Sequence, residues 1–208
     1  MWLIPSCSPY GSGTLVIVSM TSIDNHRPYL ILITVRFGAA IALGDYLRAY
    51  QDNLEVRQSI QTLIGTSLQK IREQPLTLLS PSSNPTDRTF HCSHGPEPWE
   101  VSDGGLHLLL QYATILPHDP FSLTQFQLLV EVSSIQAFPR SHMWLDSFWN
   151  QVADIIESLD AHSVHAFLQQ FIPTLQTSLQ SNTQSVRVAS RRALLVVESI
   201  LGSQLNLQ

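Results

Sequence analysis

The chain has 208 residues, an apolar fraction of 44% and a formal net charge of −5. This apolar content is enough to fill a sizeable core, which argues against a chain that is disordered throughout. The acidic balance argues against a general nucleic-acid binder, because such a protein needs a basic stripe to meet the phosphates. Cys7 and Cys92 lie far apart and give no disulfide framework, which favours a reducing compartment, the cytoplasm or the nucleus.

The amino-terminal part contains two apolar runs, at 14–20 and 29–35. Each is much shorter than the about 20 residues of a membrane-spanning helix. No Lys or Arg precedes the first run, as it would in a signal peptide. We therefore expect no membrane span and no secretion signal. Residues 1–27 are expected to form an irregular leader, although the β-branched residues of the two runs would also suit two short strands.

Two helices are expected after the leader. The first runs from about 29 to 50, with one apolar face formed by Val35, Ala39, Ala42, Leu43 and Leu47. The second runs from about 54 to 72, and Asp52 or Asn53 offers its cap. Its apolar residues follow the helical spacing i, i+4, i+7 and i+8: Val56, Ile60, Leu63, Ile64, Leu68 and Ile71.

Residues 74–98 form a segment rich in proline and serine. Proline removes a backbone donor and stops a helix, so we expect a long loop. The loop contains the metal-like cluster of His91, Cys92 and His94. Zinc needs three or four ligands, and no second Cys or His pair stands at the usual spacing. Metal binding is therefore kept only as a minor alternative, and no cofactor is expected.

Further helices are expected over 99–116, 121–138, 141–159, 164–179 and 186–201. Pro117, Pro120 and Pro139 separate the earlier ones, and Gly202 follows the last. Residues 181–185 form the turn between the final two helices. The last helix is rich in apolar residues, including Val196, Val197, Ile200 and Leu201. We infer from this that the chain either forms a homodimer or lacks neighbouring repeats.

A nine-residue pattern, V-R-x-small-x-x-x-A-L, occurs at 35–43 and 186–194, with a degenerate copy at 101–109. Its first, fourth, eighth and ninth places fall on one side of a helix, and the small fourth residue would let another helix approach closely. The positions expected to pack between repeats are Val35, Arg36, Ala42, Leu43, Val101, Gly104, Val186, Ala189, Ala193 and Leu194.

These segments resemble the second helix of HEAT and armadillo-type repeats, whose consensus is close to V-R-x-A-A-x-x-A-L. Residues 163–202 are similar to a whole repeat, including a proline, Pro173, in the first helix. The resemblance implies an all-α fold, a right-handed α-solenoid of about four helix pairs. The chain then divides into a leader (1–27), a first helical repeat region (28–73), an inserted loop (74–98) and HEAT/armadillo-like repeats (99–208).

Arginines follow the leading valine of the pattern at Arg36 and Arg187. The resemblance implies that this arginine joins a polar ladder between adjacent repeats by pairing with a carboxylate on a neighbour. A contact with a phosphopeptide or an acidic partner is the alternative. Arg191 and Arg192 follow on the more exposed side of the same helix and could present a small basic edge to a partner.

Two tryptophans, Trp144 and Trp149, are candidate anchors for a protein interface, since tryptophan is enriched at binding hot spots. They are five residues apart and therefore diverge by about 140° around a helix. One is expected to pack on a neighbouring repeat and the other to lie at an edge.

Catalytic motifs are not found. The sequence has no G-x-S-x-G elbow, phosphate-binding loop or dinucleotide fingerprint, so we expect no enzyme. The favoured function is a non-catalytic scaffold or adaptor that binds a protein or peptide within a larger assembly. The alternatives are a regulatory or accessory helical domain of a larger kinase- or phosphatase-type protein and, third, a small metal-binding protein built on His91, Cys92 and His94.

Overall fold

The computed structural model describes residues 2–5, 15–18, 28–72, 98–135 and 141–205, with side chains described within 38–72, 99–135 and 142–202. The elements are β1 (Trp2–Pro5), β2 (Leu15–Val18), α1 (Pro28–Ala49), α2 (Leu54–Gln69), the 3-10 turn η1 (Lys70–Arg72), α3 (Pro98–Ile115), α4 (Pro120–Ser133), α5 (Ser141–Ser158), α6 (Ala161–Leu179) and α7 (Gln184–Leu205). Helices make up nearly all of this described chain, so the prediction of an all-α protein is confirmed.

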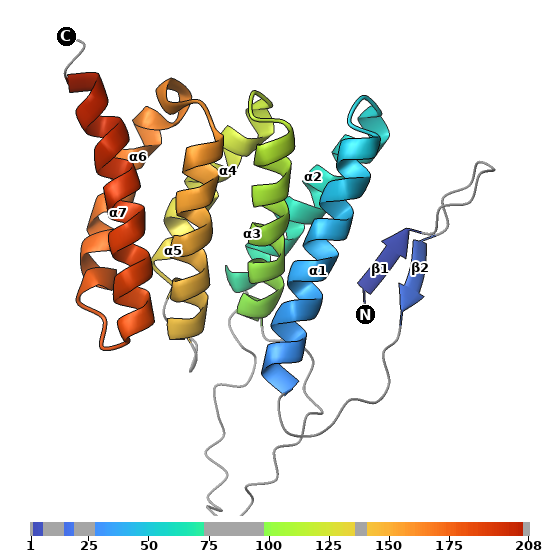
Figure 1. The fold of residues 1–208 in the computed structure, drawn as a ribbon, viewed down its shortest axis with the longest axis horizontal. Helices are drawn as coiled ribbons and strands as arrows, with labels where there is room; N and C mark the ends of the chain where they lie inside the picture. The colour runs from blue at the N-terminus through green and yellow to red at the C-terminus, as the bar shows by residue number, and fades with distance from the viewer. Residues whose placement is uncertain (1, 6–14, 19–27, 73–97, 136–140, 206–208) are drawn as a thin grey trace, which may run out of the picture.

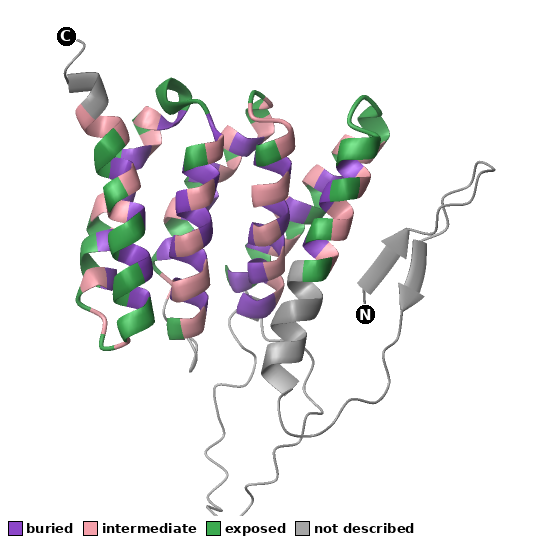
Figure 2. Cartoon of the chain, viewed as in Figure 1, coloured by how far each residue is buried: buried purple, intermediate pink, exposed green. Residues whose placement is uncertain are grey.

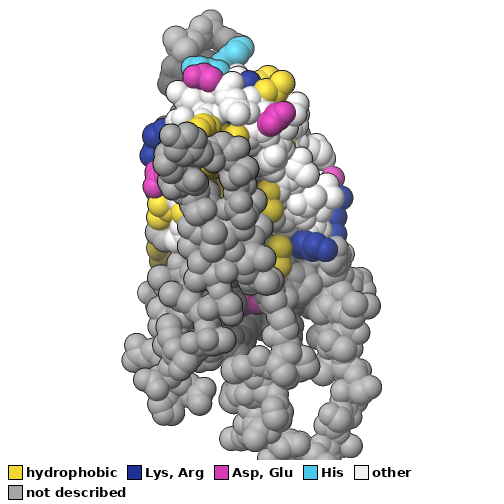
Figure 3. All heavy atoms as spheres, turned by 90° about the vertical axis from the view of Figure 1, so that its right-hand side faces the viewer, with side chains coloured by type: hydrophobic (Ala, Val, Ile, Leu, Met, Phe, Trp, Pro, Cys, Tyr) yellow, Lys and Arg dark blue, Asp and Glu magenta, His cyan; other side chains and the backbone are white. Residues whose placement is uncertain are grey.

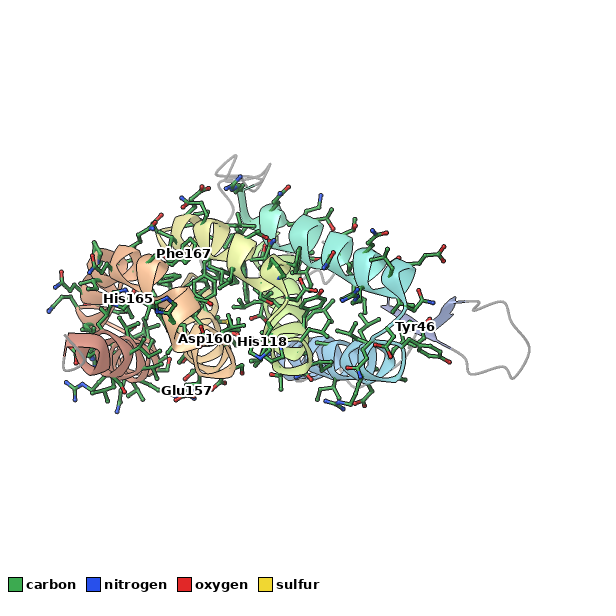
Figure 4. The ribbon with its side chains drawn as sticks, turned by 90° about the horizontal axis from the view of Figure 1, so that it is seen from above. Tyr46, His118, Glu157, Asp160, His165 and Phe167 are labelled. Atoms are coloured by element: carbon green, nitrogen blue, oxygen red, sulfur yellow. The ribbon has the colours of Figure 1, made fainter. Side chains whose placement is uncertain are left out.

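The helices form two rows. Helices α1, α3, α5 and α7 lie side by side in one row, and α2, α4 and α6 form the second row behind them (Figure 1). The view from above shows the same two rows (Figure 4). Each helix of the first row packs on the next one, while α2 packs on α3 and α6 on α7 across the rows. Helices α1 and α7 therefore lie at opposite ends of the stack.

Local signals set most of the helix boundaries. Helices α1, α3 and α4 each begin at a proline, Pro28, Pro98 and Pro120, where the missing N–H has no helical partner to lose. Asp160 caps α6, because its carboxylate accepts hydrogen bonds from the hydroxyl and the backbone N–H of Ser163, both 2.9 Å long. The hydroxyl bond of Ser163 is the main reason that the pKa of Asp160 is lowered.

Helix α4 ends earlier than the sequence predicts. It stops at Ser133 rather than 138. The hydroxyls of Ser133 and Ser134 donate to the carbonyl oxygens of Val130 and Glu131, and such bonds compete with helix continuation. The tail of the expected helix, 136–138, lies outside the described residues.

The leader contains regular structure. Strands β1 and β2 pair antiparallel, with Trp2 opposite Val18, and β1 lies against α1. The expectation of an irregular leader is thus wrong at these two segments, because the run from Leu15 to Val18 consists of residues that favour an extended backbone. The other run, 29–35, is helical within α1. Most of the proline-rich loop, 74–97 with His91, Cys92 and His94, lies outside the described residues.

Buried residues occur in every helix from α1 to α7 and form one core cluster (Figure 2). Helix α5 is enclosed on several sides, since it lies between α3 and α7 and also contacts α6. Its fully buried side chains include Trp144, Phe148, Trp149, Ala153 and Ile155. Among the described residues, no helix is both long and apolar enough to cross a membrane.

The nine-residue pattern does not mark one equivalent face in its three helices. In α7 the expected residues Val186, Ala189 and Ala193 are buried, and Leu194 packs against the core. In α1, Gly38 is exposed and a Cβ there would meet open space. The buried positions of α1 are Ala40, Gly44 and Leu47 instead, while Ala42 and Leu43 are half-buried. The side chains of Val35 and Arg36 are outside the described part.

In α3 the last two places of the pattern, Leu108 and Leu109, are buried as expected, but the burial of its first and fourth places is displaced by one residue. Val101 and Gly104 are half-buried, and the close approach is made by Gly105. A Cβ on Gly105 would lie 2.7 Å from Cβ of Ser67 in α2. The buried face of a helix is set by its neighbours. Helix α1 packs on α3 within its row, whereas α3 contacts α1, α2 and α5.

Candidate interaction surface

Helix α7 ends the stack, and one of its sides is open. Val186, Ala189, Ala193 and Val197 face the core and are buried. On the opposite side Val188 is 63% exposed and Leu195 is 61% exposed. Of the apolar residues that the sequence analysis emphasised in this helix, Val197 is buried, and Val196, Ile200 and Leu201 pack against the core. The exposed apolar surface of α7 is therefore formed by Val188 and Leu195 rather than by those four residues.

Two charged residues share this open side with Val188 and Leu195. Arg191 and Glu198 are exposed, and neither side chain makes a hydrogen bond or ion pair with another described residue. Val188 and Leu195 are seven residues apart, as are Arg191 and Glu198. Residues seven apart lie within about 20° of each other around a helix. We call the surface formed by Val188, Arg191, Leu195 and Glu198 the outer face of α7.

Arg192 does not belong to a free basic edge. Its guanidinium donates to the carboxylate of Asp154 in α5 and lies 3.4 Å from that of Glu157. The hydrogen bond with Asp154 is the main reason that the pKa of Arg192 is raised. Glu157 lies on the outer side of the first row (Figure 4), so the pairs join α7 to α5 across the surface of that row.

Arg187 does not pair with a carboxylate of the described chain. It donates to the carbonyl oxygen of Ser181 over 2.7 Å and closes the turn between α6 and α7. Within the described chain Arg187 thus does not make the carboxylate contact expected of it, and it is Arg192 that makes ion pairs between α7 and α5. Of the three clustered arginines, Arg191 is the one whose charge is directed to solvent without a partner in the described chain.

Two further arginines join elements of the second row. Arg57 of α2 lies 3.8 Å from the carboxylate of Asp119, the cap of α4. Arg72 of η1 pairs with Glu131 near the other end of α4. Neither pair was predictable from the sequence, because the partners are far apart in the chain and neither arginine stands in the nine-residue pattern.

Neither tryptophan is available to a partner. Trp144 and Trp149 are both fully buried, so the expectation that one lies at an edge is wrong. The indole of Trp149 donates to Ser178 Oγ in α6 and packs edge-on against Phe171. Trp144 packs against Phe148. The two indoles diverge around α5, but α5 is enclosed on several sides, so both directions lead into the core.

A hollow of about 500 Å³ lies between α6 and α7. It is lined by His165, Gln169, Ile172, Pro173 and Leu201. This hollow is open and mainly apolar, and Leu201 of α7 forms one of its walls. It enlarges the area that a partner could cover there.

A smaller hollow of about 240 Å³ lies where α3, α5 and α7 begin. Its lining residues are Trp99, Asp103, His142, Met143, Asp146, Ser147 and Ser185. The carboxylate of the buried Asp103 accepts a hydrogen bond from Ser147 Oγ, and Gln151 donates to the same hydroxyl over 3.2 Å. His107 Nε2 is 3.8 Å from the other Asp103 oxygen.

The bond from Ser147 to Asp103 joins α5 to α3, and it directs the proton of Ser147 to a carboxylate rather than to a histidine base. A nucleophile of the serine–histidine type would need the opposite arrangement. No group of three His, Cys, Asp or Glu residues within the described chain is placed to hold a metal ion. The geometry of this hollow therefore favours a structural role for Asp103.

The opposite end of the stack, at α1 and α2, carries mixed charge. Side chains of Lys or Arg, side chains of Asp or Glu and apolar ones are mixed with uncharged ones on the coloured part of this end (Figure 3). Arg48 is paired with Asp45 at 2.8 Å. Exposed apolar residues here include Leu54 and Leu63. This end offers a matched control surface for the α7 end.

The structure thus gathers one expected residue, Arg191, with three that the sequence analysis missed, Val188, Leu195 and Glu198. The seven-residue spacing of Val188 and Leu195 on the side opposite Val186 was the available signal. No protein-family model, curated protein or solved structure matches this chain.

Proposed function

We propose that this chain is a non-catalytic interaction scaffold that binds a protein partner at its α7 end. The observation that carries the proposal is the outer face of α7. Helices α1, α3 and α5 are each followed by a neighbour in their row, whereas the outer face of α7 exposes Val188 and Leu195 by 63% and 61%. Exposed apolar side chains that share one side of a helix with charged ones give a partner both apolar area to bury and charges to pair, as protein contact sites do.

The proposed architecture is the right-handed α-solenoid of HEAT/armadillo-like helix pairs that the sequence resemblance implies. The two-row order of the helices supports it, because each helix packs mainly on its neighbours in the stack. Proteins of this kind commonly present extended surfaces to other proteins. We place the scaffold in the cytoplasm or nucleus and in a larger assembly.

Affinity capture with the full chain tests the proposal. The variant Val188→Asp/Leu195→Asp puts two charges on the outer face of α7. The matched control, Leu54→Asp/Leu63→Asp, puts two charges on exposed apolar positions, 57% and 43% exposed, at the other end of the stack. Circular dichroism and thermal unfolding establish that both variants fold.

We expect a defined partner, identified by mass spectrometry, to bind the wild type and the control and to be lost from the α7 variant. Binding that survives in the α7 variant but is lost in the control would place the contact at the other end and contradict the proposal. If the partner carries a kinase or phosphatase active site, the accessory-domain alternative is favoured over a general scaffold.

A further inference from the structure

We propose that the partner at the α7 end is a second copy of this chain, bound with the two α7 helices antiparallel about a twofold axis. The inference rests on the proposed function, since it requires the outer face of α7 to be a contact surface. It is argued from the order of charged and apolar residues on that face.

The outer face consists of two parallel edges. One edge carries Val188 and Leu195, and the other carries Arg191 and Glu198. Along each edge the two residues are separated by about 10.5 Å, two turns of helix. The charged edge is therefore positive toward the start of α7 and negative toward its end, and both of its charges lack partners among the described residues.

A twofold axis perpendicular to two facing antiparallel helices places each edge opposite the same edge of the other copy and reverses its direction. When the axis lies level with the midpoint between Arg191 and Glu198, Arg191 of each copy faces Glu198 of the other. The same axis lies beside Leu195, so the two Leu195 side chains meet. In a parallel arrangement, with the twofold axis along the helices, the charged edge of each copy would instead face the apolar edge of the other and would leave both charges unpaired. The face is thus self-complementary in charge and in apolar surface, as an isologous interface requires.

The expected dimer is weak. A stable complex buries about 800 Å² on each partner, and one helix face provides less than that. The apolar hollow beside Ile172, Pro173 and Leu201 adds to the contact area. Because Leu195 and Val188 are mostly exposed in the single chain, their burial favours association. We therefore expect a dimer whose population depends on protein concentration.

Sedimentation velocity of the full chain over about 1–100 μM is the test, since it spans the affinities of weak complexes. The wild type is expected to shift from monomer to dimer in this range. In a dimer of Arg191→Glu, positions 191 and 198 of the two copies face each other with negative charges at two places. In a dimer of Glu198→Arg they face each other with positive charges. Each variant alone should bind itself at least about tenfold more weakly.

An equimolar mixture of the two variants is the sharpest arm of the experiment. In the mixed dimer the two substituted positions face each other with opposite charges, and the unchanged Arg191 of one variant faces the unchanged Glu198 of the other. The mixture should therefore recover the affinity that each variant alone has lost. Leu195→Asp should keep the chain monomeric, and Leu63→Asp, on α2, should leave the dimer unchanged.

A wild type that stays monomeric throughout the range overturns the inference, and so does a mixture that recovers no dimer. A dimer that survives Leu195→Asp also overturns it, because the contact must then lie elsewhere. The proposed function is judged separately. If the chain is monomeric but an identified protein partner is still lost with Val188→Asp/Leu195→Asp, the scaffold proposal stands and only the second copy is wrong.

Discussion

Trp149 of α5 donates a hydrogen bond from its indole nitrogen to Ser178 Oγ of α6, 3.0 Å away, and both residues are buried. The other buried tryptophan of α5 lacks such a bond, since Trp144 Nε1 is buried without a hydrogen-bond partner among the described residues. The two side chains differ in what their N–H groups contribute. The Trp149 bond joins the two rows of helices, whereas the Trp144 N–H loses its contact with water and gains no bond within the described chain.

This difference predicts unequal costs for the same substitution. Trp149→Phe removes the indole N–H and with it the hydrogen bond to the Ser178 hydroxyl, whereas Trp144→Phe removes an N–H that makes no such bond. Trp149→Phe should therefore destabilise the fold by about 1 kcal/mol more than Trp144→Phe does. Urea denaturation monitored by circular dichroism gives both free energies of unfolding. Ser178→Ala should cost about 1–3 kcal/mol, because it leaves the Trp149 donor buried and unpaired. Ser199→Ala, at an exposed position of α7, is the control.

Gly105 should not tolerate alanine. Its Cβ would lie 2.7 Å from Ser67 Cβ and 3.2 Å from the backbone nitrogen of Leu68, so α2 and α3 would have to separate. We expect Gly105→Ala to lower the free energy of unfolding by about 1–3 kcal/mol. The control is Gly65→Ala in α2, where a Cβ would meet nothing within 4 Å. Alanine there should stabilise the helix by up to about 1 kcal/mol. Equal effects of the two substitutions would contradict the close packing.

Tyr112, whose side chain is fully buried, should make stability fall at alkaline pH. Burial, followed by its hydrogen bond to Asp119, raises the pKa of Tyr112 from 10.0 to about 12. The hydroxyl donates to Asp119 Oδ2 and accepts from Gln61, both over 2.7 Å. The folded state holds the phenol proton more tightly than the unfolded state does. The protonated Tyr112 therefore contributes about 2–3 kcal/mol to the free energy of unfolding, which is fully present below pH 10 and is lost as the pH rises from 10 to 12.

Chemical denaturation at a series of pH values checks this loss. Tyr112→Phe should be less stable than the wild type at neutral pH but should lack this alkaline component. Tyr50→Phe, which removes a half-exposed tyrosine at the end of α1, should keep it. An alkaline loss of the same size in Tyr112→Phe and in the wild type would show that Tyr112 is not its source.

Substitution of Arg192 should affect the stability of the fold, whereas substitution of Arg191 should affect the dimer. Arg192→Ala breaks the pairs that join α7 to Asp154 and Glu157 of α5. Since Arg192 is partly exposed, the cost should be no more than about 1 kcal/mol and should shrink at high salt. Arg191→Ala should leave the free energy of unfolding unchanged and weaken the dimer instead. Thermal unfolding and sedimentation of both variants measure the two properties, and a loss of stability in Arg191→Ala would count against its free position.

Helix boundaries were largely predictable because their causes are local. Pro98 and Pro120 start helices, and Asn53 caps α2 through bonds to the N–H groups of Glu55 and Val56. The seven helices of the described chain begin and end within a few residues of the predicted limits, apart from the end of α4. The candidate site was predictable only in part. Arg191 stood in the expected basic cluster, but Arg187 and Arg192 are used within the chain.

The sequence by itself determined that this protein is a series of helices and roughly where each begins and ends, since periodicity, prolines and caps act over a few residues. The tertiary structure decided which face of each helix is buried and which charges are free. Gly38 and Gly105 illustrate this. Each is a small residue in a copy of the nine-residue pattern, but of the two only Gly105 lies against another helix. Burial and ion pairing depend on atoms supplied by helices distant in the chain, and no local pattern contains that information.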